Sequence, residues 1–298
     1  MALRTMVLIT MALSEQKHKI AQAFGRAAAH YDNVAEFQQQ TGYLLYQLLV
    51  QLIRQFPTTD PMNSSLFSAI ASKASKLLLQ NTVSTRPLCG KKILDAGCGT
   101  GYFSDVFQQQ GAEVTALDLS SGMLEVARKK GSAQHFICAD MEAIPIADKS
   151  FDVTFSNLAI QWCDPLDIAL SELYRVTKPG GWVIFTTLAE GSLVELSQAW
   201  QQVDNKTHVN HFLALSSIKS TCSSWRNNLL LQPITPTYTT LNGLLRSLKG
   251  IGATHLTQGR QSGLMTRQQL NQLEQVYPTV NDRYPLTYQT VFGVLYRD

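Results

Sequence analysis

The stretch that decides the fold is Ile93-Leu94-Asp95-Ala96-Gly97-Cys98-Gly99-Thr100-Gly101. It starts inside a short apolar run, Lys92–Ala96, which is typical of a buried strand. Three glycines then follow at alternate positions, Gly97, Gly99 and Gly101. Glycine lets the backbone turn tightly and approach a ligand without a Cβ clash, and the helix expected next offers free N–H groups. The stretch therefore predicts a strand that leads into a ligand-binding loop.

The spacing of the glycines and the acids around them indicate which ligand this loop binds. A dinucleotide fingerprint is G-x-G-x-x-G, whereas this loop is G-x-G-x-G with Asp95 in front of it. A second acid, Asp118, closes the next expected strand at 113–117, where a carboxylate can accept both hydroxyls of a ribose. The alternative role of Asp118 is a helix cap, which Ser120 or Ser121 could provide instead. The glycine spacing therefore differs from that of a dinucleotide site, and Asp118 favours a ligand that carries a ribose.

Strand and helix patterns alternate through the middle of the chain. The expected strands are 92–96, 113–117, 134–139, 151–155 and 182–188, and the expected helices are a segment that ends near 110, 121–130 and 166–176. Such alternation predicts βαβ units and a parallel sheet, with ligands at the carboxyl ends of the strands.

The segments that flank this core have mixed patterns. We expect helices at 20–53, 64–86, 191–230 and 241–249, a sixth strand at 232–239 and a last strand at 285–296. Phe24, Ala27, Ala28 and Tyr31 would form one apolar stripe of the first helix. The expected organisation is an extension over 1–19, a helical region over 20–90, a core over 91–190, a helical insertion over 191–230 and the remainder of the sheet over 231–298.

The composition limits the class of protein. The chain has 298 residues, 45% hydrophobic content and a net charge of +3, which suits one large domain and gives no concentrated basic stripe for nucleic acid. Its five cysteines are widely spaced without a Cys-x-x-Cys pair, so we expect reduced thiols and no structural zinc. Residues 1–13 are too short to span a bilayer, and Ser14-Glu15-Gln16 is a poor cleavage site. These features predict a cytoplasmic protein that binds neither a membrane nor a metal.

The glycine loop with its acids resembles motif I of the class I methyltransferases that use S-adenosylmethionine. The resemblance implies a Rossmann-like, seven-stranded, mostly parallel α/β sheet with an antiparallel last strand, N-terminal helices and a helical insertion after the fifth strand. It also implies a set of cofactor-binding residues: Asp95, Gly97, Cys98, Gly99, Gly101, Asp118, Leu119, Met123, Asp140, Met141, Asn157 and Leu158.

Some of these residues carry distinct expected roles. Asp140 would accept from the adenine amino group, and Met123 would pack on the adenine ring, although a lone methionine is more typical of a core. The backbone of Asn157 and Leu158 would line the methionine end of the cofactor. We expect Glu142 to be a solvated loop charge.

The flanks carry a narrower resemblance. Residues 24–32, 157–163, 185–188 with 191–193, 246–253 and 283–288 are together similar to the malonyl-acyl-carrier-protein O-methyltransferases of biotin synthesis. This implies methylation of the free carboxylate of a malonyl thioester on acyl carrier protein, an acidic and transient partner, by a monomeric enzyme. The methyl ester would mask the charge so that the fatty-acid elongation machinery accepts the chain.

The implied chemistry explains why no catalytic acid or base is assigned. A carboxylate is ionised near neutral pH and can attack a sulfonium methyl directly, so the enzyme must align the reacting atoms and exclude water. Arg246 is the candidate for holding the malonyl end, with a solvated helix charge as its alternative. Tyr31, Gln161 and Trp162 are further substrate-side candidates, and packing is the alternative for Tyr31 and Trp162. Lys249, together with Arg260 and Arg267, would steer acyl carrier protein.

Three rival hypotheses remain at this point. Another class I methyltransferase acting on a quinone, a sterol or another small molecule would share the same cofactor residues. A non-catalytic relative would bind the cofactor as a sensor or scaffold. A nicotinamide-dependent oxidoreductase on a related sheet is disfavoured by the glycine spacing.

Overall fold

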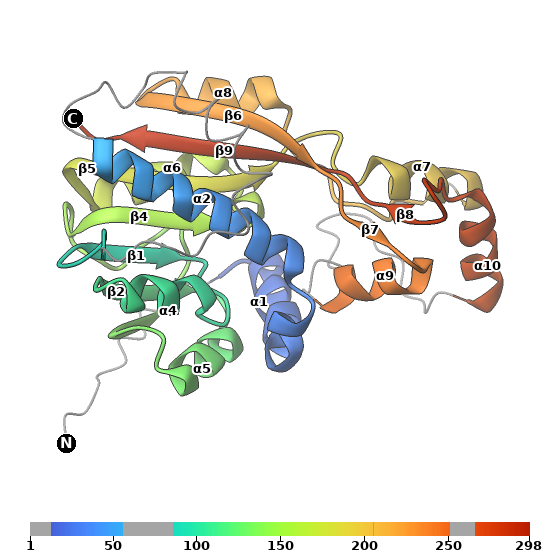
Figure 1. Cartoon of the computed structure of the whole chain (residues 1–298), viewed down its shortest axis with the longest axis horizontal. Helices are drawn as coiled ribbons and strands as arrows, with labels where there is room; N and C mark the ends of the chain where they lie inside the picture. The colour runs from blue at the N-terminus through green and yellow to red at the C-terminus, as the bar shows by residue number, and fades with distance from the viewer. Residues whose placement is uncertain (1–12, 56–85, 205, 251–265) are drawn as a thin grey trace.

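The computed structural model describes residues 13–55, 86–204, 206–250 and 266–298, and their centre is one seven-stranded sheet (Figure 1). Its strand order is β3-β2-β1-β4-β5-β9-β6. The strands are β1 (Lys92–Ala96), β2 (Glu113–Asp118), β3 (His135–Cys138), β4 (Phe151–Asn157), β5 (Thr177–Leu188), β6 (Arg226–Ile234) and β9 (Tyr288–Tyr296).

The direction of the strands places the ligand site. Strands β1 to β5 pair in parallel, whereas β9 runs antiparallel to both β5 and β6. The mostly parallel sheet with an antiparallel last strand is therefore confirmed. The strand order reverses between β1 and β4, and the loops that follow such a pair diverge and open a crevice at the carboxyl edge of the sheet.

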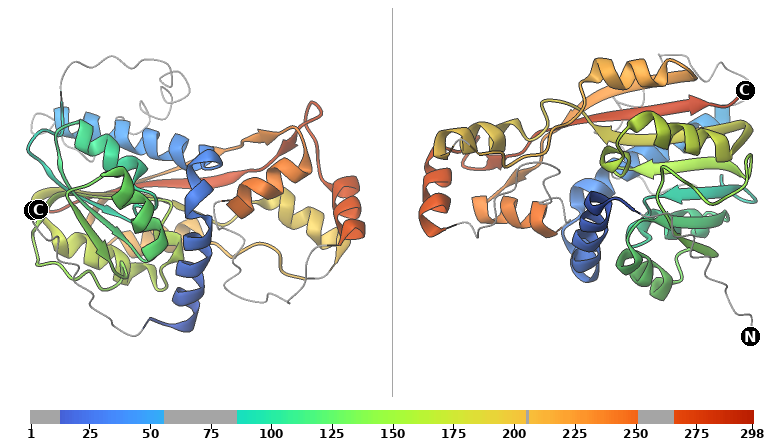
Figure 2. Two further views of the ribbon diagram at one scale, coloured as in Figure 1. Left: turned by 90° about the horizontal axis from the view of Figure 1, so that it is seen from below. Right: turned by 180° about the vertical axis from the view of Figure 1, so that it is seen from behind.

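Helices cover both faces of the sheet (Figure 2). On one face lie α2 (Glu36–Gln55), α4 (Tyr102–Gln109) and α5 (Ser121–Lys130), and on the other lie α6 (Leu166–Val176) and α8 (Leu215–Cys222). Successive residues of β1 serve the two faces, because Ile93 belongs to the apolar cluster with α2 and α4 and Leu94 to the cluster with α6 and α8. Burial on both faces explains why these strands read as continuous apolar runs.

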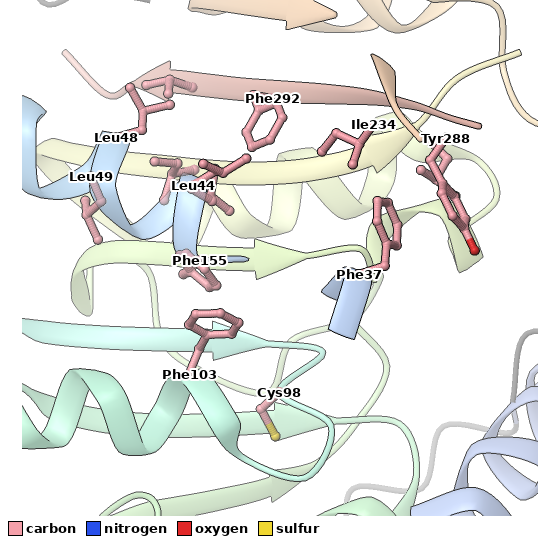
Figure 3. Packing of buried hydrophobic residues seen from close by; sticks show 14 of the residues in the cluster. Phe37, Leu44, Leu48, Leu49, Cys98, Phe103, Phe155, Ile234, Tyr288 and Phe292 are labelled. Atoms are coloured by element: carbon pink, nitrogen blue, oxygen red, sulfur yellow. The ribbon is translucent and has the colours of Figure 1, made fainter. Parts of the chain in front are cut away.

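A small lobe lies beyond the carboxyl edge of the sheet, reached by β6 and β9 (Figure 1). The small lobe consists of α7 (Val194–Val203), α9 (Leu241–Gly250), α10 (Arg267–Val276) and the two-stranded pair β7 (Thr237–Tyr238) and β8 (Tyr284–Pro285). Phe37 of α2 stacks on Tyr288, where β9 begins, with ring centroids 3.8 Å apart (Figure 3). This contact joins α2 to the strand that leads out of the small lobe.

The C-terminal half differs from the expected pattern in its element boundaries. The segment 191–230 does contain the helices α7 and α8, but β6 already begins at Arg226 instead of residue 232. The run Leu229-Leu230-Leu231 lies on an edge strand and shows no alternation of polar and apolar residues, so its sequence is equally compatible with a helix. The last strand begins at Tyr288 because β8 pairs with β7 in the small lobe first. Helix α10 was not expected.

The N-terminal helical region is also divided. Helix α1 (Glu15–Ala27) gives way to a 3₁₀ turn, η1 (Ala28–Asn33), before α2 begins at Glu36. The expected stripe from Phe24 to Tyr31 is therefore wrong, because Tyr31 lies in η1 and not on the same helix. The helix expected at 64–86 and the basic residue Arg260 lie outside the described residues. No helix in the described part of the chain is long and apolar enough to cross a membrane.

Candidate active site

The glycine loop after β1 turns through left-handed backbone at all three glycines. The φ angles are 74° at Gly97, 55° at Gly99 and 79° at Gly101, a region that other residues rarely adopt. A Cβ on Gly97 would lie 2.3 Å from the Cβ of Ala159, and one on Gly101 would lie 2.1 Å from Ser132 Oγ. A Cβ on Gly99 would meet nothing within 4 Å. The outer glycines therefore serve packing, whereas the middle glycine faces open space.

Two acids are held beside this loop by hydrogen bonds. Asp118 accepts from the backbone N–H of Gly99 at 2.8 Å and of Ser120 at 2.7 Å, and burial raises its pKa to about 6. Asp95 is 2% exposed and accepts from Ser104 Oγ at 2.6 Å. Burial raises the pKa of Asp95 to about 7, and the charge of Asp118 adds to that rise. Ser120, as expected, caps α5 itself.

A pocket opens at the carboxyl edge of the sheet, between the glycine loop and the N-terminal segment. Its lining residues are Tyr31, Asp32, Ala35, Gln38, Gln39, Asp95, Gly97, Cys98, Gly99, Thr100, Tyr102, Phe103 and Asn157. Two of the described lining residues are aspartates and none is basic, so the pocket suits a cationic ligand. Cys98 is no nucleophile at neutral pH, because burial raises the pKa of its thiol well above the ordinary value.

Sequence reasoning missed part of this pocket. Gln38 and Gln39 come from α2, and Asp32 comes from η1. Asp32 accepts from Thr100 Oγ1 at 2.5 Å and is paired with Lys130 of α5, so it joins η1 to the glycine loop and to α5. The similarity of segment 24–32 to the family was the available signal for Asp32. No spacing rule connects the glutamines to the loop, because only the tertiary fold brings α2 to this edge.

Tyr31, one of the expected substrate-side residues, lines the pocket, and its role toward a ligand stays a prediction. Burial raises the pKa of its phenol above the ordinary value, with the charges of Asp118 and Asp32 as further causes. The phenol therefore stays protonated at neutral pH and can donate a hydrogen bond.

Helix α1 covers the side of the site where the third strand ends. Lys17 of α1 forms ion pairs with Asp140 and, at 2.6 Å, with Glu142. Glu142 also accepts from the backbone N–H of Asp164 at 2.9 Å, and its side chain is 14% exposed. The expectation that Glu142 is a solvated loop charge is therefore wrong, because the sequence does not show that α1 returns a lysine to this loop.

The apolar residues expected near the adenine are buried. Met123 is 1% exposed and Met141 is 6% exposed, and neither is among the residues that line the pocket. The Cε of Met141 lies 3.4 Å from the position that a Cβ on Gly97 would take. Leu119 is partly buried, and its carbonyl accepts from Cys138 Sγ. Their roles toward a ligand stay predictions.

The carboxyl end of β4 forms a further wall. Asn157 lines the pocket, and Leu158 follows with a left-handed φ of 50°. Gln161 Nε2 donates to the carbonyl of Leu158 at 2.9 Å, while Gln161 Oε1 is buried without a hydrogen-bond partner in the described part of the chain. Trp162 makes an edge-to-face contact with Phe24 of α1, with centroids 5.4 Å apart. Trp162, which ends the 3₁₀ turn Ile160–Trp162, therefore packs against α1.

The remaining substrate-side candidates lie apart from the pocket. Arg246 and Lys249 are exposed on α9 in the small lobe, and neither lines the pocket. Their roles toward a substrate stay predictions. No group of three or more His, Cys, Asp or Glu in the described ranges is placed to hold a metal ion.

Comparison with known proteins identifies the family. A family model described as a methyltransferase domain matches residues 94–185. The malonyl-[acyl-carrier protein] O-methyltransferase of Yersinia pestis is 45% identical over 286 residues, which cover 96% of this chain and 94% of the relative. The enzyme of the same name from Serratia marcescens is 43% identical over 282 residues, which cover 95% and 96%. The chain belongs to this methyltransferase family.

Solved structures support the family at the level of the fold. A protein of Bacillus halodurans C-125 superposes with a TM-score of 0.51 at 17% identity and covers 78% of this chain and 100% of its own. The YcgJ protein of Bacillus subtilis gives a TM-score of 0.50 at 16% identity, with 70% and 93% covered. The relatives named above match this methyltransferase along nearly its whole length, so the flanking segments belong to the family as well as the core.

Proposed function

We propose that this methyltransferase transfers the methyl group of S-adenosylmethionine to the free carboxylate of malonyl-acyl carrier protein. The observation that carries the proposal is the acidic pocket at the carboxyl edge of the sheet, in a chain 43% and 45% identical to two relatives of that name. The methyl ester removes a negative charge from the acyl end, which would let fatty-acid elongation enzymes use it as a primer for biotin synthesis.

The residues at the pocket fit the methyl donor. S-adenosylmethionine, when bound, supplies an electrophilic methyl group on a sulfonium and carries a positive ammonium group. Asp95 and Asp32 line the pocket, none of the described lining residues is basic, and the ion pair of Asp32 is with Lys130 outside the lining. Gly99 leaves room beside these acids. We propose that the cofactor is held by Asp95, Gly97, Cys98, Gly99, Gly101, Asp118, Leu119, Met123, Asp140, Met141, Asn157 and Leu158.

The two acids differ in what they offer. Each oxygen of Asp118 already accepts one backbone N–H, and a carboxylate oxygen has a further lone pair for a ribose hydroxyl. Burial raises the pKa of Asp95 to about 7, and a cation bound at the start of the loop would favour the ionised form of this carboxyl. Asp140 would accept from the adenine amino group while Lys17 stays paired with it from outside.

On the acceptor side the chain's task is alignment. The malonyl carboxylate is already ionised near neutral pH, so no residue has to remove a proton from it. Tyr31 can donate a hydrogen bond inside the pocket without taking up the proton, because its pKa is raised by burial. Helix α1 and η1 cover the site and exclude water from the reacting groups.

A methyl-transfer assay tests the proposal. The purified chain is incubated with S-adenosylmethionine and malonyl-acyl carrier protein, and the carrier is analysed by intact-mass spectrometry for one added methyl group. Acetyl-acyl carrier protein is the matched control, because it presents the same carrier and thioester without the free carboxylate. Methylation of free small acids but not of the malonyl carrier would contradict the proposed acceptor. Growth of a biotin-requiring strain that carries the chain tests the pathway role separately.

A further inference from the structure

One buried hydroxyl links the two central strands to the wall of the pocket. Thr186 of β5 lies opposite Asn157 of β4 in the sheet register and is 0% exposed. Its Oγ1 donates to Asn157 Oδ1 at 2.9 Å and accepts from the backbone N–H of Leu158 at 2.9 Å. Asn157 Nδ2 in turn donates to the carbonyl of Gln38 in α2 at 2.9 Å. Thr186 itself does not line the pocket, whereas Asn157 and Gln38 do.

The polarity of this network is set by groups that cannot change role. The N–H of Leu158 can only donate, so the oxygen of Thr186 accepts there and its single hydrogen is left for Asn157. The carbonyl of Gln38 can only accept, so the nitrogen of the Asn157 carboxamide must face it. The orientation of an amide is normally ambiguous, but here the Gln38 carbonyl sets it, and the hydroxyl hydrogen of Thr186 is available for the amide oxygen on the other side.

This orientation leaves one donor available. A carboxamide nitrogen carries two hydrogens, and Asn157 Nδ2 uses one of them on Gln38. The second hydrogen has no acceptor among the described residues, and Asn157 forms part of the pocket wall beside two aspartates and no basic side chain. A carboxylate that enters this pocket meets no basic side chain among the described lining residues, and the Asn157 N–H is one neutral donor that it can use besides Tyr31.

We propose that Thr186 is a positioning residue that fixes the Asn157 carboxamide, so that the pocket presents an N–H donor to a ligand carboxylate. The proposal rests on the proposed function, in which two ligands carry a carboxylate: the methionine part of the cofactor and the malonyl group. A flipped carboxamide would present an oxygen to that carboxylate and repel it.

The same hydroxyl also supports the turn after β4. Leu158 has a left-handed φ of 50°, which costs free energy for a residue with a Cβ. Its N–H donates to Thr186 Oγ1 at 2.9 Å and also to the Thr186 carbonyl at 3.2 Å. The carbonyl of Leu158 accepts from Gln161, so the position of Gln161 follows from this turn. Loss of the hydroxyl removes one of the two acceptors of the Leu158 N–H as well as the donor to Asn157.

The test compares substitutions that differ only at the hydroxyl. Thr186→Val removes it at constant shape, and Thr186→Ser retains it. Thr154→Val is the matched control, since Thr154 is also buried in β4, bonds Thr177 of β5 at 3.0 Å and does not line the pocket. S-adenosylhomocysteine binding is measured by calorimetry, and KM for malonyl-acyl carrier protein is measured at saturating S-adenosylmethionine. Thermal unfolding reports on stability.

We expect Thr186→Val to weaken one of the two ligands about tenfold, Thr186→Ser to stay within about threefold of the parent, and Thr154→Val to change stability only. Weaker binding of S-adenosylhomocysteine assigns the Asn157 donor to the cofactor carboxylate. A raised KM with unchanged S-adenosylhomocysteine binding assigns it to the malonyl carboxylate. The binding of S-adenosylhomocysteine needs no turnover, so its affinity can be measured even if malonyl-acyl carrier protein proves not to be the substrate.

A double-mutant cycle separates positioning from general damage. In an Asn157→Ala background, Thr186→Val should cause no further loss of ligand affinity, because the group that Thr186 positions is gone. An equal loss in both backgrounds would overturn the proposal. So would ligand affinities of Thr186→Val that match those of Thr154→Val.

Discussion

At the scale of single residues, the site keeps two buried carboxylates close together. Burial raises the pKa of Asp95 to about 7 and that of Asp118 to about 6, from an ordinary value of 3.8. Between pH 3.8 and these raised pKa values, the folded, ligand-free protein therefore keeps protons on the two carboxyl groups that the unfolded chain has released. Their contribution to the free energy of unfolding is fully present below pH 3.8 and is lost as the pH rises through about 7.

Asp95→Asn should make the ligand-free protein more stable and the ligand weaker. The amide can still accept from Ser104 but carries no buried charge, so unfolding at pH 8 should cost up to about 4 kcal/mol more, with little change at pH 4. The affinity for S-adenosylhomocysteine should fall, because the ammonium group of this ligand loses a counter-charge. Thermal unfolding at both pH values and calorimetry check this. Asp282→Asn is the control, an exposed residue at a φ of 57° that asparagine tolerates; equal stabilisation of both variants would refute the argument.

Arg246 can be tested through its geometry as well as its charge. If Arg246 binds the malonyl group, Arg246→Ala should raise KM for the malonyl carrier about tenfold and leave the affinity for S-adenosylhomocysteine unchanged. Arg246→Lys should restore only part of the loss, because an ammonium cannot bind a carboxylate with two parallel hydrogen bonds. Unchanged steady-state kinetics in Arg246→Ala would remove this exposed residue from the site.

At the scale of elements, α1 crosses α5 at two glycines. A Cβ on Gly122 would lie 2.9 Å from Gly25 Cα and 3.2 Å from its carbonyl oxygen, so the two backbones are in contact. This close crossing lets Lys17 of α1 reach Asp140. The cover over the site is therefore set by backbone packing as much as by charge.

Gly122→Ala should loosen that cover. The added methyl group meets backbone that cannot move alone, so α1 must shift, at a cost of about 1–3 kcal/mol. The affinity for S-adenosylhomocysteine should fall about tenfold or more, because the residues that α1 and η1 bring to the site move when α1 shifts. Ser121→Ala, one residue earlier on the exposed side of the same helix, should leave binding unchanged. Calorimetry and urea unfolding measure both effects, and parent-like affinity in Gly122→Ala would argue against α1 as a cover.

How far an element could be predicted depended on how its sequence is buried. Strands β1 and β2 have continuous apolar runs with an acid at or near the end, and helices α5 and α6 begin and end where predicted. Strand β6 was placed too late, since three consecutive leucines on an edge strand give no period. The division between α1 and α2 was missed because tertiary contacts of Asp32 set it.

The candidate site shows the same limit. The glycine loop, Asp95, Asp118 and Asn157 could be found because each follows a recognisable strand. Gln38, Lys17 and Thr186 could not, because their importance comes from contacts with residues more than 25 positions away in the chain. A spacing rule reports on neighbours in sequence, whereas these groups meet only in the fold.

At the scale of the whole molecule, charge is spread unevenly relative to the pocket. The pocket wall is acidic, whereas Arg246, Lys249 and Arg267 are exposed in the small lobe beyond the same edge of the sheet. An acidic carrier protein that docked on the small lobe would bring its acyl end toward the pocket. Charge steering of this kind acts on the association rate and weakens with salt.

Lys249→Glu should therefore lower kcat/KM for the malonyl carrier by about threefold to tenfold at low salt, with a smaller effect at high salt. Lys219→Glu on α8, packed on one face of the sheet, changes the net charge equally and should have little effect. Steady-state rates over a range of salt concentrations measure the difference. If both variants respond alike, net charge matters and the small lobe is no docking surface.

The place of β9 has a consequence for synthesis on the ribosome. This strand is the last in sequence order, yet it fills the position between β5 and β6 and pairs with both. Until β9 has been made, the backbone N–H and C=O groups on the β9 side of β5 have no partner, and β6 has no strand to pair with. The nascent chain must keep this gap from closing on itself or on another copy until residues 288–296 leave the exit tunnel. A slow pause late in translation would thus endanger this protein more than an early one.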